Sequence, residues 1–267
     1  MPDTPIDIGF PDAPDLHLRI ATGACKVRVA PAGSGDDPQR WVTGTYRDPS
    51  GLRPTKVTVE GSTASITPDR PSLGWELVSK VPEYDLALGT AKPSRLSLDL
   101  GASDNDVELG GLPLRRAEIR LGAGRLLLRF SAPNPEAMTL LSLSLGAGSV
   151  EVTGLANADA AEMVVDGGAA AFKLRFDGQL RRGGHVKVSA GMSSVELAVP
   201  ATTAAKIAAS EAVMSSVQTD PDIVRAEGAY WTPAARQGGT PLLTIDASVS
   251  LGALQLRTLA APPPLGS

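Results

Sequence analysis

The residues best suited to nucleophilic chemistry are a single cysteine and two histidines. Cys25 is the only cysteine in the chain, so no internal disulfide is expected. A thiol nucleophile requires a nearby base, and the only histidines are His17 and His185. Alternation in residues 25–29 places Cys25 on the apolar face of a strand, with the basic side chains on the other face. We therefore predict that Cys25 is a small buried hydrophobe and not a catalytic thiol.

Three aspartates form the best candidate for a metal site. Asp99, Asp104 and Asp106 lie around Gly101, and Asn105 adds an amide oxygen. Carboxylate and amide oxygens are ligands that Ca²⁺ prefers in proteins. The spacing of an EF-hand and its terminal glutamate are absent, however, and Asp and Asn also favour turns. We therefore expect a solvated, turn-forming loop at this place, with no bound metal and no cofactor.

Two further charged runs are interpreted as structural. Asp220 and Asp222 flank Pro221, which is typical of a turn and not of an acid/base pair. Arg181 and Arg182 are expected at a solvated corner of the fold. The sequence also contains no glycine loop for a phosphate or dinucleotide, no zinc-protease motif and no nucleophile elbow. These observations predict that the protein is not an enzyme.

Composition excludes some partners and some locations. The 267 residues include 25 Lys and Arg and 29 Asp and Glu, so the net charge is −4. A mildly acidic chain has no excess of positive charge for a phosphate backbone, so we predict no nucleic-acid partner. The first residues lack the pattern of a signal peptide, and no uninterrupted stretch of 18 apolar residues occurs. The sequence as given therefore predicts a cytoplasmic protein.

A glycine-centred unit recurs along the chain. Each unit has a short alternating strand, a turn rich in Gly and Ala, a second strand and a return loop. Successive turn glycines from 101 to 191 are 21 to 24 residues apart, and a last unit at 242–257 repeats the pattern. We identify six glycines as structural turns: Gly101, Gly122, Gly146, Gly168, Gly191 and Gly252.

The period of the units predicts the architecture. Two short strands with their turns need about 22 residues, and such a unit cannot bury its apolar face alone. Stacked units bury a continuous seam, so we predict an all-β, single β-solenoid-like domain with rungs of about 22 residues. The turn glycines must then tolerate positive φ and close approach of neighbouring backbones. The alternative is an antiparallel β-sandwich of hairpins, which would also show regular turns.

The flanks are less regular than the repeats. Residues 1–90 are predicted to form an N-terminal β segment that caps the solenoid, and residues 91–258 form the repeat region. The Pro-rich tail at 259–267 is expected to be disordered. Residues 201–216 are Ala-rich and fit either a helix or a strand pair, and 220–241 fit a loop anchored by aromatic residues.

Several motifs resemble one bacterial family. Gly74-Trp75-Glu76-Leu77, Val81-Pro82 and Leu86-Ala87-Leu88-Gly89 resemble the signature of the toast-rack N-terminal domain. The glycine repeats fit this domain and the related adhesin-type repeat domains. The segment from Ala229 to Leu256 resembles the terminal strands of LiaF-like proteins, and this likeness implies that 203–218 is extended. The resemblance spans roughly residues 15–258.

The resemblance implies a β-solenoid-like fold, a bacterial source and no established enzymatic activity. LiaF-like proteins are membrane-associated regulators of envelope-stress signalling that act through a sensor kinase. This sequence differs from them because it shows no N-terminal membrane helices. The family offers no catalytic residues to transfer to this chain.

Three functional hypotheses follow. The leading one is a non-enzymatic interaction or regulatory module that resembles the soluble part of LiaF-like regulators. Its partner would be a protein, such as a membrane sensor protein, docked on an exposed strand face or a terminal edge. Homo-oligomers would form through the solenoid ends. The second hypothesis is a surface adhesin or an envelope structural protein. The third, a carbohydrate-active solenoid, is disfavoured because aromatic residues are few and scattered.

Overall fold

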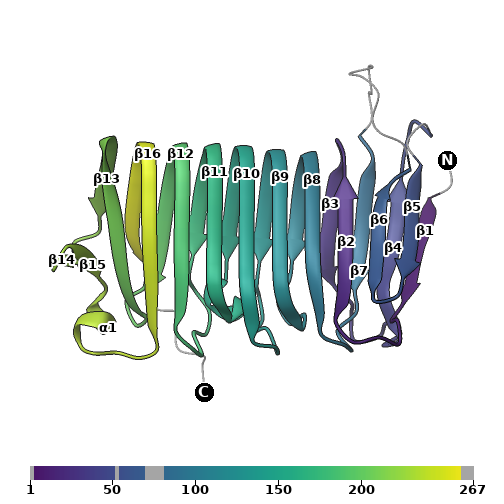
Figure 1. Cartoon of the computed structure of the whole chain (residues 1–267), viewed down its shortest axis with the longest axis horizontal. Coiled ribbons are helices and arrows are strands. Elements are labelled where there is room, and N and C mark those ends of the chain that lie inside the picture. Colours follow the sequence, from purple (N-terminus) through teal and green to yellow (C-terminus); the bar gives the residue numbers. More distant parts are fainter. Residues whose placement is uncertain (1–2, 52–53, 70–80, 260–267) are drawn as a thin grey trace.

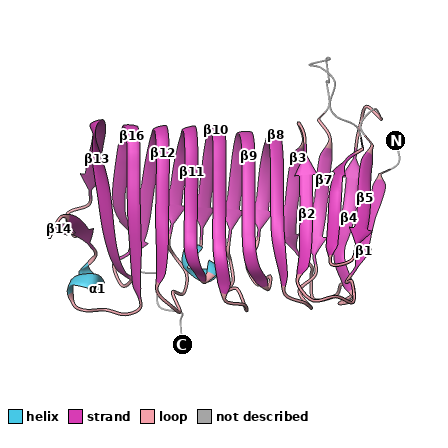
Figure 2. Cartoon of the chain, viewed as in Figure 1, coloured by secondary structure: helices cyan, strands magenta, loops and turns pink. Residues whose placement is uncertain are grey.

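Long parallel strands stack side by side along most of the molecule (Figure 1). The computed structural model describes residues 3–51, 54–69 and 81–259, and for residues 211–215 it describes the backbone alone. Figure 2 shows that strands dominate the described chain, with two short helical turns, η1 (Leu155–Ala158) and α1 (Pro233–Arg236). The long strands are β8 (Ser94–Glu108), β9 (Leu114–Arg129), β10 (Met138–Thr153), β11 (Ala160–Arg175), β12 (Gly184–Pro200), β13 (Ala204–Thr219) and β16 (Leu242–Leu259).

Each long strand bends near its middle and so contributes to two walls. In β9, buried Ala117, Ile119 and Leu121 alternate with more exposed residues before the bend. After the bend, Leu126 and Leu128 are the buried positions. We call the part before the bend the first arm, the part after it the second arm, and the row of bends the crest. The first arms form one wall and the second arms form a second wall, and the bent strands join the two walls at the crest. The apolar core fills the space between them (Figure 1).

The predicted all-β solenoid is confirmed, and the antiparallel sandwich is wrong for the repeat region. Neighbouring long strands are parallel, and equivalent residues of successive units lie side by side. Leu98, Ile119, Leu143 and Val165 occupy one such row inside the first wall. The period therefore sets the register, since a slip by one residue would turn each apolar row towards solvent.

The crest glycines lie in two columns. Gly101, Gly122, Gly146, Gly168 and Gly191 form the first column, which begins at Gly23. A Cβ on Gly146 would lie 2.4 Å from the carbonyl oxygen of Gly122, so close backbone approach is the constraint here. The predicted positive φ does not occur in this column. It occurs in a second column two residues further on, at Gly124, Gly148 and Gly252.

The N-terminal strands continue both walls. β2 and β3 together make one rung, because β2 pairs with the first arm of β8 and β3 with its second arm. Beyond this rung the first wall continues through β6 and β5, and the second wall through β7, β4 and β1. The bounds are β1 (Thr4–Gly9), β2 (Leu16–Thr22), β3 (Lys26–Pro31), β4 (Arg40–Arg47), β5 (Thr55–Glu60), β6 (Thr63–Pro68) and β7 (Glu83–Leu88).

The C-terminal unit does not lie at the end of the stack. β16 is inserted between β12 and β13 and is parallel to both. The chain reaches it through β14 (Val224–Ala226), β15 (Ala229–Trp231) and α1, which lie beyond β13. Residues 204–219 are extended, as the LiaF-like resemblance implies, so the helical alternative is wrong.

Two parts of the sequence analysis cannot be compared with this fold. The segment Gly74-Trp75-Glu76-Leu77 lies outside the described residues. The predicted tail at 259–267 also lies outside them, apart from Leu259, which ends β16.

Asp220 holds the inserted strand at its end. The turn at Pro221 places this carboxylate beside β16, where Oδ2 accepts the Thr258 N–H at 2.9 Å. Oδ1 accepts a hydrogen bond from Arg257 Nη1 at 2.8 Å. These two contacts lower the pKa of Asp220 below its ordinary value. The aspartates at 220 and 222 are therefore structural, because Asp222 accepts a hydrogen bond from the Thr258 hydroxyl.

We expect Gly146→Ala to lower the free energy of unfolding by about 2 kcal/mol, because the new methyl would overlap backbone that cannot move aside. Gly23→Ala is the matched control. It lies at the start of the same column, and a Cβ there meets nothing within 4 Å. Denaturant unfolding of both variants tests the constraint. Equal losses of stability in the two variants would show that backbone approach is not what selects glycine.

The Asp220 contacts also predict a pH dependence. Because the folded state lowers its pKa, Asp220 stabilises the fold above the unfolded pKa, and this contribution is lost as pH falls through the folded value. The difference in unfolding free energy between the native sequence and Asp220→Asn should therefore shrink between about pH 5 and pH 2. Denaturant melts across this range measure it. A difference that stays constant would contradict the assignment.

Candidate functional site

An open groove of about 600 Å³ runs along the first wall beside the crest. It crosses five neighbouring strands, β9, β10, β11, β12 and β16, so at strand spacing it is about 20 Å long. We call it the crest groove. Its lining residues are Arg120, Leu121, Gly122, Ser144, Leu145, Gly146, Asp166, Gly167, Gly168, Ser189, Ala190, Gly191, Ser248 and Ser250.

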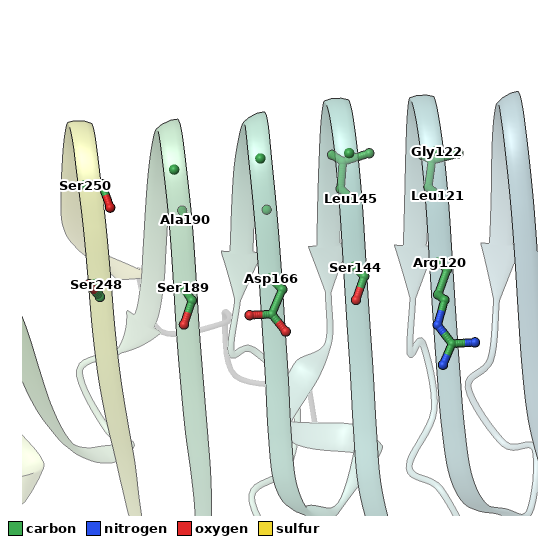
Figure 3. A pocket seen from close by; sticks show the side chains of 14 residues that line it. Arg120, Leu121, Gly122, Ser144, Leu145, Asp166, Ser189, Ala190, Ser248 and Ser250 are labelled. Carbon is green, nitrogen blue, oxygen red and sulfur yellow. The ribbon is translucent and has the colours of Figure 1, made fainter.

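One row of polar side chains forms the floor of the crest groove, and all of them except Arg120 are short. Arg120, Ser144, Asp166, Ser189 and Ser248 occupy equivalent positions on successive strands. Figure 3 shows these side chains in one line on the outer face of the first arms, just below the bends. The bare glycines of the crest form the adjacent edge of the groove. The surface is thus flat, regular and narrow, with hydrogen-bonding groups at intervals of about 4.8 Å.

The charged end of the groove is internally paired. Arg120 contacts Asp99 at 3.2 Å and Glu118 at 3.0 Å. Glu118 also accepts a hydrogen bond from Arg116 at 2.6 Å, and this bond with the nearby positive charges lowers the pKa of its carboxyl. These charged side chains form ion pairs with one another on the outer surface of the wall, where such pairs contribute little to stability.

His17 lies on the same outer face and has no thiol beside it. Its Nε2 lies 2.9 Å from the Ser97 hydroxyl. Partial burial and the neighbouring charges of Arg95 and Arg19 lower the pKa of this imidazole. Cys25 lies in the bend just before β3 and not in a strand, but it is 4% exposed, so its predicted burial is confirmed. The structure therefore does not bring the cysteine and this histidine together as a nucleophile and base.

The three aspartates of the candidate metal site are separated by the bend. Asp99 projects from the first arm of β8, whereas Asp104 and Asp106 project from its second arm, on the opposite wall. The prediction of a loop is wrong, because β8 runs through the bend as a paired strand. Asp106 forms an ion pair with Arg129. Within the described residues, no group of three or more His, Cys, Asp or Glu side chains could hold a metal ion.

The basic run at 181–182 lies at a partly exposed corner, in the return loop between β11 and β12, and both arginines are paired there. Arg181 Nη2 lies 3.0 Å from Asp159 Oδ2, and Arg182 Nε lies 3.2 Å from Asp159 Oδ1. Arg181 also donates to the main-chain carbonyl of Asn134 in an earlier return loop, and Arg182 donates to that of Met138 at the start of β10. The two arginines thus clamp successive return loops together, and both form ion pairs with Asp159.

Buried asparagines also join the return loops, and the sequence analysis did not single them out. Asn134 is 1% exposed and its Nδ2 donates to the carbonyl of Leu114 at 2.8 Å. Asn157 Nδ2 donates to the carbonyl of Phe130 at 2.8 Å, and its Oδ1 accepts the Gln179 N–H. The signal was present, because these asparagines are one repeat apart in the sequence. Both link one turn of the solenoid to the next.

His185 lies near the start of β12. It pairs with Asp246 of the neighbouring β16 at 3.3 Å, and both side chains are about half exposed. Farther along the wall, Trp231 of β15 donates from Nε1 to the carbonyl of Ala226 at 3.0 Å. Lys206 lies over its ring, 5.2 Å from the centroid. These contacts support the end of the stack.

A family model for the N-terminal domain of toast_rack, DUF2154, matches residues 3–153. The chain belongs to this toast-rack family. The match covers β1 to β10 and confirms the resemblance seen in the sequence. A search among curated proteins finds no match. Within the described residues of this toast-rack protein, no helix has the length and apolar character of a membrane span.

Solved structures with a similar chain path come from other bacteria. A Clostridium sporogenes protein provisionally described as a cell adhesion protein is 14% identical, with a TM-score of 0.49, over 97% of this toast-rack chain and 99% of that chain. A provisional adhesin of Bacteroides fragilis is 11% identical, with a TM-score of 0.44, over 96% and 97%. A provisional lipid binding protein of Parabacteroides distasonis is 13% identical, with a TM-score of 0.41, over 95% and 96%.

We expect Asp159→Asn to lower the free energy of unfolding by about 2 kcal/mol, because two arginines lose their shared carboxylate. Asn tolerates the left-handed backbone of this residue, at φ 50°, so the substitution leaves the local conformation in place. Asp246→Asn is the control, since its pair with His185 is exposed and should matter by less than about 0.5 kcal/mol. Denaturant unfolding compares them, and equal effects would contradict the clamp.

Proposed function

We propose that this toast-rack protein is a non-enzymatic interaction module that binds a protein partner along the crest groove. The observation that carries the proposal is a row of polar side chains in register over five strands, four of them short, beside the glycine backbone of β9 to β12. Such a surface offers regular donors and acceptors with little side chain to displace. It is suited to contact with an extended or flat protein surface.

The chemistry of the groove supports binding over catalysis. Its serines have no histidine, lysine or cysteine among the lining residues that could act as a base. Asp166 is its single carboxylate, whereas glycoside hydrolysis generally uses a pair. The lining also has no aromatic ring on which a sugar could stack. These features disfavour the carbohydrate-active alternative at this site.

The regulatory part of the proposal rests on the family. LiaF-like proteins, which the C-terminal strands resemble, regulate envelope-stress signalling through a sensor kinase. The partner proposed here is accordingly a membrane sensor protein. A rigid wall suits this role, because a preformed surface loses little conformational entropy on binding.

The test is affinity capture from solubilised membranes of the source bacterium, read by mass spectrometry. We expect Ser189→Arg to reduce recovery of the sensor protein about ten-fold, because a long cation then occupies the middle of the groove. Ser194→Arg is the matched control. It changes the same residue type in the same strand, but on the opposite wall.

Two outcomes would contradict the proposal. If both variants recover the partner equally well, the crest groove is not the binding surface. If the native protein captures no other protein reproducibly, the interaction module itself is wrong. Circular dichroism and thermal melting of both variants establish that each one is folded before the comparison is made.

A further inference from the structure

The N-terminal end of the first wall is an open sheet edge. Among the described residues, β5 pairs with β6 and with no other strand. Val57 and Val59 lie on the same face of this hairpin as Ile66 and Ala64, which are fully buried. The two valines are nevertheless 39% and 50% exposed. The core-facing side of β5 is thus left partly uncovered, at the right-hand end of Figure 1.

The free edge of β5 presents backbone hydrogen-bonding groups. A two-residue turn, Gly61-Ser62, joins the hairpin, so the flanking pair Glu60 and Thr63 is a hydrogen-bonded pair. By alternation, the N–H and C=O groups of Thr58 and Lys56 also point to β6. Those of Val57 and Val59 therefore point away from β6, towards the open edge.

The edge strand is complementary to itself. Residues 56–60 read Lys-Val-Thr-Val-Glu, with a cation at one end and an anion at the other. We infer that two copies of this chain associate by antiparallel pairing of β5, with Thr58 on the two-fold axis. Each Lys56 then lies opposite Glu60 of the second copy, and each Val57 opposite Val59 of the second copy. A two-fold interface requires this kind of self-complementarity.

The direction in which the N–H and C=O groups of β5 point agrees with this register. Val57 of one copy and Val59 of the second copy both carry free N–H and C=O groups. Placed opposite each other, they form hydrogen-bonded pairs on both sides of the axis. A register with Lys56 opposite Lys56 of the second copy would also satisfy the backbone, but it places like charges together. Registers centred on Val57 or on Val59 satisfy the backbone too, but they place Lys56 or Glu60 opposite Thr58. Only the register centred on Thr58 pairs each Lys56 with Glu60 of the second copy, so charge favours it.

The edge of the second wall is protected against the same pairing. β1 contains Pro5, which has no N–H to donate. Its core-facing Ile6 and Ile8 are 2% and 3% exposed, so no apolar side chain remains to be covered there. Of the two edges at this end, β5 alone combines exposed apolar side chains with free backbone groups. The inference does not depend on the crest groove or on the proposed function.

The first measurement is sedimentation velocity of the full chain over a concentration series. We expect a dimer in the native sequence. Lys56→Glu and Glu60→Lys should each raise its dissociation constant about ten-fold or more, because two opposite-charge pairs become like-charge pairs. The double variant Lys56→Glu/Glu60→Lys is the matched control. It has the native composition and net charge, restores both pairs, and should dimerise like the native protein.

A mixing experiment tests the register more sharply. Equimolar Lys56→Glu and Glu60→Lys chains should form a heterodimer, because two glutamates in one chain then face two lysines in the other. One of the two chains is labelled uniformly with ¹⁵N, so that native mass spectrometry distinguishes this heterodimer from either homodimer by mass. Val57→Pro should abolish the dimer without removing a hydrogen bond to β6, and its thermal melt shows whether the hairpin is intact.

Three results would overturn the inference. A native chain that stays monomeric up to about 1 mM, the dissociation constant of a weak contact, has no such interface. A dimer or larger assembly that is unaffected by the single charge reversals uses another surface. A mixture that forms no heterodimer while the native chain dimerises rules out the register centred on Thr58.

Discussion

The structure depends on how closely the backbones of successive turns approach at the crest. Gly122 and Gly146 stack so tightly that a single methyl group between them would overlap a carbonyl oxygen. Contacts of this kind from Gly23 to Gly191 set the bends of these rungs at the same height, and the bend in turn aligns both arms. The apolar rows between the walls can then stay in register over many strands. A constraint of a few ångströms at the crest thus determines the spacing of the whole outer surface.

The return loops lie at the side of the walls opposite the crest, where the backbone needs hydrogen-bond partners outside the strands. There the chain leaves the ladder, and buried main-chain groups need partners. Asn134 and Asn157 supply them by bridging from one turn to the next, and Asp159 with its two arginines adds a charged clamp. The polar side chains of the return loops are therefore occupied by contacts within the fold. The crest side keeps its polar side chains available, which is why the candidate binding surface lies there.

A solenoid leaves open edges at its ends, and the two ends of this chain differ. At the C-terminal end, β16 returns into the stack, while β15, β14 and α1 lie against β13 and cover part of its edge. At the N-terminal end, β1 has a proline and buried isoleucines, whereas β5 has an uncovered apolar face. This difference between the two edges is a physical reason to expect association at β5.

The sequence by itself determined the strands, the period and the row of crest glycines, because these are local patterns repeated at a constant interval. It also placed Cys25 in the core by alternation alone. Only the tertiary structure decided that β16 enters between β12 and β13, since a parallel unit fits equally well at any place in the stack. It also decided that Asp99 and Asp106 lie on opposite walls. These two residues are close in sequence but lie apart because the strand bends between them. The local sequence pattern does not show in which direction each arm faces.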